Sequence, residues 1–221
     1  GNDQLKIDRI RKITPEDNVK TEDFVKSSDY SGEQMYDELY KIADSFEDEE
    51  LKAIVTAILA DNRLALLYWP AAFKLHHALR GGLLMHSLSI VRLAEGVCRV
   101  YPFVDRELLL AGAILHDIAK LSEFTVADTG IATGYSNEGN LLEHMVLSHH
   151  GDPEFGAAVR PMFIEAELLS ELDLMDSRVF EMREAVAATK PEDFSSRLWA
   201  LDNRKLFNHS RTELDSGVKL F

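Results

Sequence analysis

The feature that most constrains this chain is an apolar run that ends in a histidine followed by an aspartate. Residues 108–120 read LLLAGAILHDIAK, so that His116 and Asp117 come directly after a stretch that a helix would bury. An aspartate is rarely buried unless it is paired or coordinates a metal ion. Neutral imidazole and carboxylate both bind divalent cations. The run therefore predicts a buried polar site, whose other residues must come from elsewhere in the chain.

Composition limits the kinds of protein that could carry such a site. With 221 residues, of which 46% are hydrophobic, the chain can hold one large domain, or one domain and a fragment of another. No apolar run approaches the roughly 20 residues that span a bilayer, and the N-terminus lacks the apolar stretch of a signal peptide. The single Cys98 favours a reducing compartment. The net charge of −14 argues against a broad basic surface for nucleic acid. We therefore expect a cytoplasmic protein that does not enter a membrane.

The N-terminal residues differ in pattern from the rest. Residues 5–13 alternate apolar and charged side chains, which favours a strand, and residues 14–32 are polar and turn-rich like a linker. One strand cannot bury its face alone, so it would belong to a sheet that the rest of the sequence does not supply. From Glu33 onward apolar residues recur at helical spacing. The predicted fold class is all-α, with a short N-terminal extended segment.

The central and C-terminal parts are predicted to contain several helices. One follows Gly81-Gly82, and the next begins at Asp105, a residue suited to cap a helix N-terminus, and carries the His-Asp pair. The turn formers over residues 125–140 indicate a loop. Further helices are expected over residues 141–150, over residues 161–188 as one or two helices, and, after Pro191, around residues 194–201.

His86, in GLLMHSLSIVRLA, is the first candidate partner of the His-Asp pair. A histidine in a largely buried helix is either a metal ligand or a core histidine satisfied by hydrogen bonds. His116 and Asp117 would diverge by about 100° on a helix, and both could still reach an ion between their directions. Lys120 lies three residues beyond Asp117, where it could steady a phosphate or be a solvated lysine.

Two later stretches supply further candidates. His149 and His150 close the segment LLEHMVLSHHG, as metal ligands, as phosphate contacts, or as surface histidines that the helix dipole favours. In AELLSELDLMDSR, Asp173 has apolar neighbours and is the better candidate ligand, whereas Asp176 could be a cap or an exposed charge. Each residue is ambiguous alone. Their order along the chain is more informative, because each is attached to an apolar helix.

This order resembles the HD superfamily of metal-dependent phosphohydrolases, whose name comes from its His-Asp pair. The stretches HHALRGGLLMHSLSIVRLAE, LLLAGAILHDIAKL, LSHHGDPEFG, EAELLSELDLMDSR and RLWALDNRKLF are further similar to the YhaM-type 3′→5′ exoribonucleases. The resemblance covers essentially residues 5–208. In that family an OB-like domain precedes the HD domain. It implies that residues 1–32 are the end of an OB-like domain plus a linker, residues 33–209 an HD domain, and residues 210–221 a tail.

The resemblance also implies roles for individual residues. By position, the metal ligands would be His86, His116, Asp117 and Asp173. His149 and His150 match a later histidine pair that serves as second-metal ligands or substrate contacts. Lys120 closes the family's HD-x-x-K motif, although the usual glycine before it is Ala119 here. The expected catalytic group is Asp117, Lys120, His149 and His150.

One departure from the family pattern concerns the region after the glycine-rich loop. YhaM-type sequences carry a further helical segment there, which begins with a motif containing a histidine. Here GYSNEGNLL runs almost directly into EHMVLSHHG, and that histidine has no counterpart. Either a second-metal ligand is absent, or the natural protein carries a segment between Asn140 and Glu143 that this sequence omits. The abruptness of the junction favours the omission.

The implied chemistry is hydrolysis at one or two divalent ions, with Asp117 as the bridging ligand. Mn²⁺ is expected first, with Fe²⁺, Co²⁺ or Zn²⁺ as alternatives. The main hypothesis is a homo-oligomeric phosphodiesterase that acts 3′→5′ on single-stranded RNA or DNA ends. The alternatives are an HD phosphohydrolase acting on nucleotides, signalling nucleotides included, and a degenerate regulatory module without a productive metal. Candidate contacts to a nucleic-acid backbone are Lys74, His76, His77 and Arg80, and Tyr68 or Trp69 would either stack on bases or pack between helices.

Overall fold

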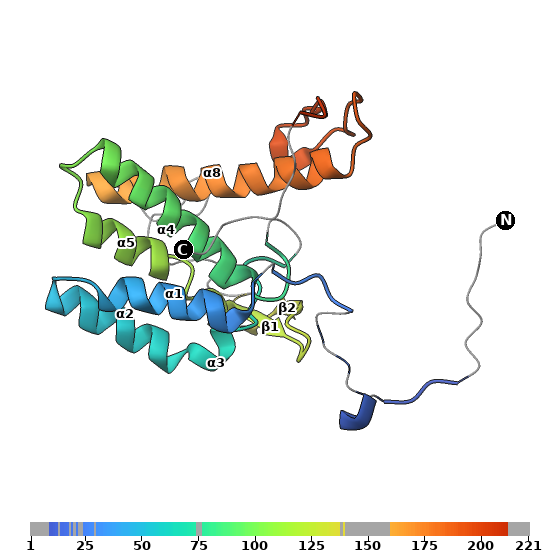
Figure 1. The fold of residues 1–221 in the computed structure, drawn as a ribbon, viewed down its shortest axis with the longest axis horizontal. Coiled ribbons are helices and arrows are strands. Elements are labelled where there is room, and N and C mark those ends of the chain that lie inside the picture. The colour runs from blue at the N-terminus through green and yellow to red at the C-terminus, as the bar shows by residue number, and fades with distance from the viewer. Residues whose placement is uncertain are drawn as a thin grey trace.

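The computed structural model of the protein describes residues 9–12, 14–17, 19, 21, 24–28, 30–73, 77–137, 139 and 160–211. Within these residues the fold is helical apart from one two-stranded hairpin, which confirms the predicted fold class (Figure 1). The α-helices are α1 (Gly32–Asp44), α2 (Glu49–Asp61), α3 (Arg63–Leu66), α4 (Gly82–Val100), α5 (Arg106–Leu115), α6 (Lys120–Glu123) and α8 (Ile164–Ala187). The remaining elements are the 3-10 turns η1 (Pro15–Asp17) and η4 (Trp199–Leu201) and the strands β1 (Phe124–Val126) and β2 (Ala132–Tyr135).

Helix α4 is the centre of the core. It packs against α5, α8 and α1, while α2 packs against α1 and α5. Figure 1 shows α8 on one side of α4 and α5, with the α1–α2 pair on the other. Every residue from Gly82 to Val91 is buried, because neighbours cover the first half of α4 on all sides. A helix buried in this way can hold a polar side chain only if that side chain has partners.

The helix starts follow local capping chemistry. Ser31 and Gln34 form a reciprocal capping box at α1, and the Asp48 carboxylate accepts from two backbone N–H groups at α2. At α5 the Asp105 carboxylate accepts from the Leu108 N–H at 3.1 Å. The cap predicted at Asp105 is therefore confirmed.

The end of α5 differs from the prediction. The helix ends at Leu115, so the His-Asp pair lies in the tight turn that follows and not within the helix. Backbone hydrogen bonds of 3.0 Å from Ile118 N–H to the Leu115 carbonyl and from Lys120 N–H to the Asp117 carbonyl close this turn. The Trp69 indole N–H also donates to the Lys120 carbonyl at 2.9 Å. Trp69 packs against the core cluster, which favours the packing interpretation of this residue over stacking on bases.

The turn into α4 requires glycine for steric reasons. Gly81 has φ +74°, in the left-handed region that favours glycine. A Cβ on Gly82 would lie 2.0 Å from the carbonyl oxygen of His77. The chain before α4 therefore passes directly over the helix start, and this approach brings His77 into the interior.

Two element predictions are wrong. Within the predicted loop over residues 125–140, β1 and β2 pair antiparallel, with Phe124 opposite Tyr135. Gly130, with φ +83°, makes the reversal between two short segments that contain β-branched residues. Around residues 194–201 only the 3-10 turn η4 forms, because this segment bonds to the chain that follows. Ser195 N–H donates to the Leu206 carbonyl at 2.8 Å, and Leu198 N–H to the Arg204 carbonyl at 3.1 Å.

Of the other predicted segments, one is confirmed, and two lie partly or wholly outside the described residues. The helix expected over residues 161–188 is the single helix α8. Most of the strand expected over residues 5–13 lies outside the described residues, and residues 9–12 belong to no helix or strand. The helix expected over residues 141–150 lies entirely outside them. Among the described helices, none combines the length and apolarity that crossing a membrane would take.

Candidate metal centre

His116, Asp117 and Asp173, three side chains predicted to bind metal, each lie close to Nε2 of the fourth, His86 on α4. His86 Nε2 lies 3.2 Å from His116 Nε2, 3.1 Å from Asp173 Oδ1 and 3.5 Å from Asp117 Oδ2. His116 Nε2 lies 3.4 Å from the same oxygen of Asp117. All four residues are buried, and Asp173 is the most exposed of them at 8%. The structure thus brings together every predicted ligand that falls within the described residues.

The hydrogen bonds of the two histidines determine which nitrogen faces the cluster. His116 Nδ1 lies 3.1 Å from the Ala113 carbonyl oxygen, which can only accept, so Nδ1 carries the proton. His86 Nδ1 lies 2.8 Å from Asp176 Oδ2 and donates to that carboxylate in the same way. In the neutral tautomers both Nε2 atoms therefore point lone pairs at each other and at two carboxylate oxygens. In that protonation state the group can hold a cation.

The spacing of these atoms fits a divalent ion. Transition-metal ions bind nitrogen and oxygen at about 2.0–2.2 Å, which places neighbouring ligand atoms about 3.0–3.5 Å apart in octahedral or tetrahedral sites. The four separations of 3.1–3.5 Å measured from the two Nε2 atoms fall in this range. His86, His116 and Asp117 also meet a simple geometric criterion for a metal site. The donor set and its spacing therefore both fit a metal ion.

The charges of the cluster are strongly coupled. Burial by itself would lower the pKa of His86, but hydrogen bonds to Asp173 and Asp176 and the charges of Asp173 and Asp117 raise this pKa to about 10. Burial likewise disfavours ionised Asp173, yet its hydrogen bond to His86 and the charges of His86 and His116 hold the pKa of Asp173 below its usual range. The two shifts have one cause, because the carboxylates favour a positive charge on His86 and that charge in turn keeps Asp173 ionised.

Lys120 is part of the same centre. Its Nζ donates to Asp117 Oδ2 at 2.6 Å, and its side chain is nearly buried. This oxygen is the one that faces both histidines. The lysine therefore supplies a fixed positive charge beside the predicted ligand Asp117, and the interpretation as a solvated lysine is wrong.

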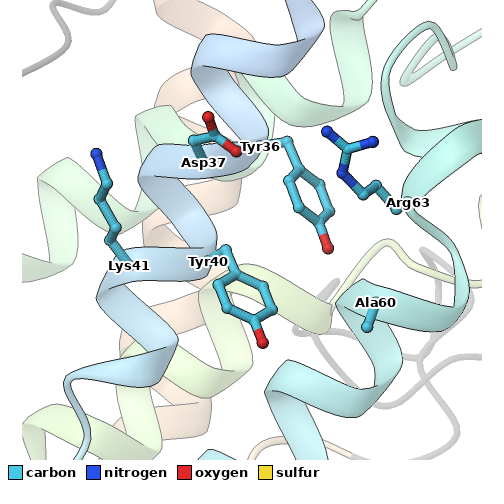
Figure 2. A pocket seen from close by; sticks show the side chains of 6 residues that line it. All are labelled: Tyr36, Asp37, Tyr40, Lys41, Ala60 and Arg63. Atoms are coloured by element: carbon cyan, nitrogen blue, oxygen red, sulfur yellow. The ribbon is translucent and has the colours of Figure 1, made fainter.

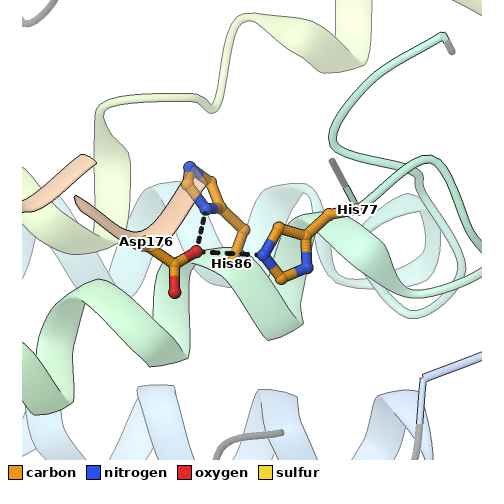
Figure 3. Close-up of side chains that lie close together, drawn as sticks. All are labelled: His77, His86 and Asp176. Atoms are coloured by element: carbon orange, nitrogen blue, oxygen red, sulfur yellow. Dashed lines mark hydrogen bonds and ion pairs between the residues drawn. The ribbon is translucent and has the colours of Figure 1, made fainter. Parts of the chain in front are cut away.

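Sequence reasoning missed a second part of the centre, made by His77 and Asp176. Asp176, expected as a cap or an exposed charge, is buried and lies 2.9 Å from His77 Nε2 and 2.8 Å from His86 Nδ1 (Figure 3). Hydrogen bonds to His77 and His86 and the charges of both hold the pKa of Asp176 below its usual range, although burial opposes this shift. A signal was available, because Asp173 and Asp176 are three residues apart and share one face of α8.

His77 itself overturns an expectation. It was a candidate for contact with a nucleic-acid backbone, but it is 1% exposed, and burial lowers the pKa of its ring. Arg80, from the same group of candidates, lies over the Tyr68 ring at 5.4 Å. His149 and His150, together with the other two backbone candidates Lys74 and His76, lie outside the described residues. Their roles stay predictions.

A separate depression lies on the opposite side of the core from α8. It is an open hollow of about 390 Å³ lined by residues of α1, α2 and α3 (Figure 2). Tyr36 and Tyr40 stack with ring centroids 5.9 Å apart, and the Arg63 guanidinium lies over the Tyr36 ring. None of the residues lining this hollow belongs to the histidine–aspartate cluster.

Comparison with known proteins agrees with the geometry. Residues 83–178 match the HD domain family model, and this range contains His86, His116, Asp117, Asp173 and Asp176. The 3′-5′ exoribonuclease YhaM of Listeria welshimeri is 35% identical over 235 residues, covering 94% of this chain and 74% of that protein. YhaM of Bacillus subtilis is 30% identical over 234 residues, with the same two coverages. The chain belongs to the YhaM family.

Two further findings concern the length of the matches to YhaM relatives and the search of solved structures. The match to YhaM of Oceanobacillus iheyensis is 32% identical over 234 residues, again covering 94% of this chain. These matches are longer than the 221 residues of the whole chain, so YhaM relatives contain residues that have no counterpart here. No solved structure gives a significant match.

Proposed function

We propose that this chain is a metal-dependent 3′→5′ exoribonuclease that shortens single-stranded RNA, or DNA, from its 3′ end. The observation that carries the proposal is the buried cluster of two imidazole nitrogens and two carboxylates in a chain of the YhaM family. Hydrolysis of a phosphodiester needs charge stabilisation on the phosphoryl oxygens and an activated water. A cluster that favours positive charge can supply the site for both.

The residues of the cluster divide this work between them. His86, His116, Asp117 and Asp173 hold the divalent ion, of which Mn²⁺ is the one proposed first. A bound divalent ion lowers the pKa of a coordinated water towards about 7 and neutralises phosphoryl charge. Lys120 keeps Asp117 oriented through the 2.6 Å contact and places an ammonium group beside the phosphate. His149 and His150 are proposed as further ligands or as contacts to the phosphate.

The remaining predictions on organisation stand as proposals. Residues 1–32 would be the end of an OB-like domain plus a linker, residues 33–209 the HD domain and residues 210–221 a tail. The substrate would be a single-stranded nucleic acid, bound by a homo-oligomer in the cytoplasm. The net charge of −14 favours contacts to short stretches of RNA over binding along a broad surface.

The test follows the fate of a labelled RNA. Single-stranded RNA carrying a 5′ label, and the same RNA carrying a 3′ label, are incubated with the full chain and Mn²⁺ beside a panel of free nucleotides. We expect the 3′ label to leave first as a mononucleotide, while the 5′-labelled strand shortens stepwise. Asp117→Asn is the matched control and should show neither reaction. Turnover of free nucleotides without shortening of RNA would replace the proposal with a nucleotide phosphohydrolase.

A further inference from the structure

The second half of the centre is built around a single oxygen atom. Asp176 Oδ2, on α8, lies 2.8 Å from Nδ1 of His86 on α4 and 2.9 Å from Nε2 of His77, which precedes α4. All three side chains are buried. Figure 3 shows the contacts from the two rings converging on the same oxygen of this carboxylate.

These contacts are hydrogen bonds, and their distances are not those between neighbouring ligand atoms of a second metal site. Distances of 2.8 and 2.9 Å are normal for N–H···O hydrogen bonds, and shorter than the 3.1–3.5 Å separations within the ligand cluster. Because a carboxylate oxygen accepts, both ring nitrogens donate. A histidine that donates through Nδ1 offers its Nε2 lone pair to a metal ion. Asp176 therefore determines the tautomer and the ring direction of His86 from the side away from the ligand cluster.

His77 is held in place by more than its hydrogen bond. Its φ of 54° lies in the left-handed region, which residues other than glycine adopt in only a few per cent of cases, with asparagine, aspartate and histidine the most frequent among them. Its carbonyl oxygen accepts from Leu79 N–H at 2.8 Å and from Ala71 N–H at 3.2 Å, and its ring lies 4.1 Å from the Phe180 ring. A strained buried residue that its surroundings fix this firmly is typical of a functional site.

We propose that Asp176 and His77 are positioning residues for His86. Asp176 orients the metal-binding imidazole, and His77 orients Asp176 by donating to the same oxygen. The proposal rests on the function proposed above, because it assigns both residues to the same metal centre. Yet His77 lies before the residues that match the HD domain, so the positioning group extends beyond that match.

The first measurement is the affinity for Mn²⁺ by calorimetry on the full chain, without RNA. Asp176→Asn is expected to weaken Mn²⁺ binding by about 10–100-fold, the usual effect of losing a partner of a ligating histidine. Asp173→Asn removes a direct ligand and should abolish measurable binding. Asp202→Asn is the matched control, because Asp202 is an exposed carboxylate that pairs with Arg178 on α8. It should bind Mn²⁺ like the wild type.

The second measurement separates the His77 ring from its backbone. His77→Asn keeps a residue that tolerates the left-handed conformation and removes the imidazole, so we expect about tenfold weaker Mn²⁺ binding by a folded protein. Thermal unfolding of the metal-free variants distinguishes positioning from a purely structural role. A structural role would lower the metal-free Tm and leave the affinity of the folded protein unchanged, which would overturn the proposal.

Two other outcomes would also overturn it. Wild-type Mn²⁺ affinity in folded Asp176→Asn would show that Asp176 does not act on His86, and equal losses in Asp176→Asn and Asp173→Asn would make Asp176 a ligand itself. If Asp176→Asn does not fold, His77→Asn decides the question. Wild-type Mn²⁺ affinity in that variant would show that His77 does not orient Asp176. Failure to degrade RNA, with the affinity losses as expected, would remove the proposed function and leave the positioning roles intact.

Discussion

The two nitrogens of the His86 ring face two groups that contain the same residue types, histidine and aspartate, but differ in their contact distances. On the Nε2 side, His116, Asp117 and Asp173 lie 3.1–3.5 Å away. On the Nδ1 side, Asp176 lies 2.8 Å away and is shared with His77. Both groups consist of buried histidine and aspartate, yet the contacts on the Nε2 side are 3.1–3.5 Å long and those on the Nδ1 side have the length of ordinary hydrogen bonds.

The comparison shows that composition alone does not identify a metal ligand. His77 and Asp176 would pass as ligands by residue type, by burial and by proximity. Their short contacts are instead the basis for the proposal that they position His86. The separation between neighbouring donor atoms is therefore the more useful criterion in a buried cluster of this kind.

The largest effect is expected on the Nε2 side. His116→Ala or Asp117→Ala should abolish Mn²⁺-dependent turnover of RNA, because each would remove a proposed metal ligand. Helical content, measured by circular dichroism, should stay near the wild-type value, since both residues lie in the turn after α5. Activity retained in both variants would show that the site has been misplaced.

An intermediate effect is expected where the chain crosses the start of α4. Gly82→Ala places a Cβ 2.0 Å from the His77 carbonyl oxygen, so the backbone around His77 must move. We expect a loss of about 1–3 kcal/mol in the free energy of unfolding, measured with urea. Gly96→Ala is the control on the same helix, because a Cβ there meets nothing within 4 Å. It should raise stability by up to about 1 kcal/mol, and an equal loss in both variants would contradict the steric argument.

The smallest effect is expected on the exposed face of α8. Arg178 pairs with Asp202 at 3.1 Å, and both side chains are exposed. Arg178→Ala should change the free energy of unfolding by less than about 1 kcal/mol and leave the Mn²⁺ affinity unchanged. A large loss of Mn²⁺ affinity in this variant would mean that charges outside the buried cluster determine that affinity. The difference between the two sides of the His86 ring would then not explain metal binding.

Much of the centre could be predicted from the sequence. The apolar run before His116 indicates burial, and the order His86, His116-Asp117, Asp173 points to one site on several helices. The residues that flank Asp176 do not indicate burial, and only helical spacing does, since Leu172, Asp173, Asp176 and Phe180 are the buried residues of α8. His77 could not have been found this way. Its position depends on a left-handed turn and on the close approach at Gly82. Neither feature produces a periodic pattern in the sequence.

The fold shows the same division between local and non-local causes. Helices with clear caps, such as α5 at Asp105, could be predicted because their signals lie within a few residues. The β1–β2 hairpin and the pairing of residues 195 and 206 depend on contacts between separate segments. Turn formers in TVADTGIATG indicate a reversal, and they do not say whether the flanking residues pair.

The contact between Lys120 and Asp117 also sets the electrical balance of the centre. Its described side chains include the carboxylates of Asp117, Asp173 and Asp176 and the ammonium group of Lys120, which contacts Asp117. With neutral imidazoles, one divalent cation makes this group electroneutral. A second would leave two uncompensated positive charges in a poorly solvated interior, where excess charge is unfavourable. On this count the charge of the described residues would balance one divalent ion, and a second would need further negative charge, such as that of a bound phosphate.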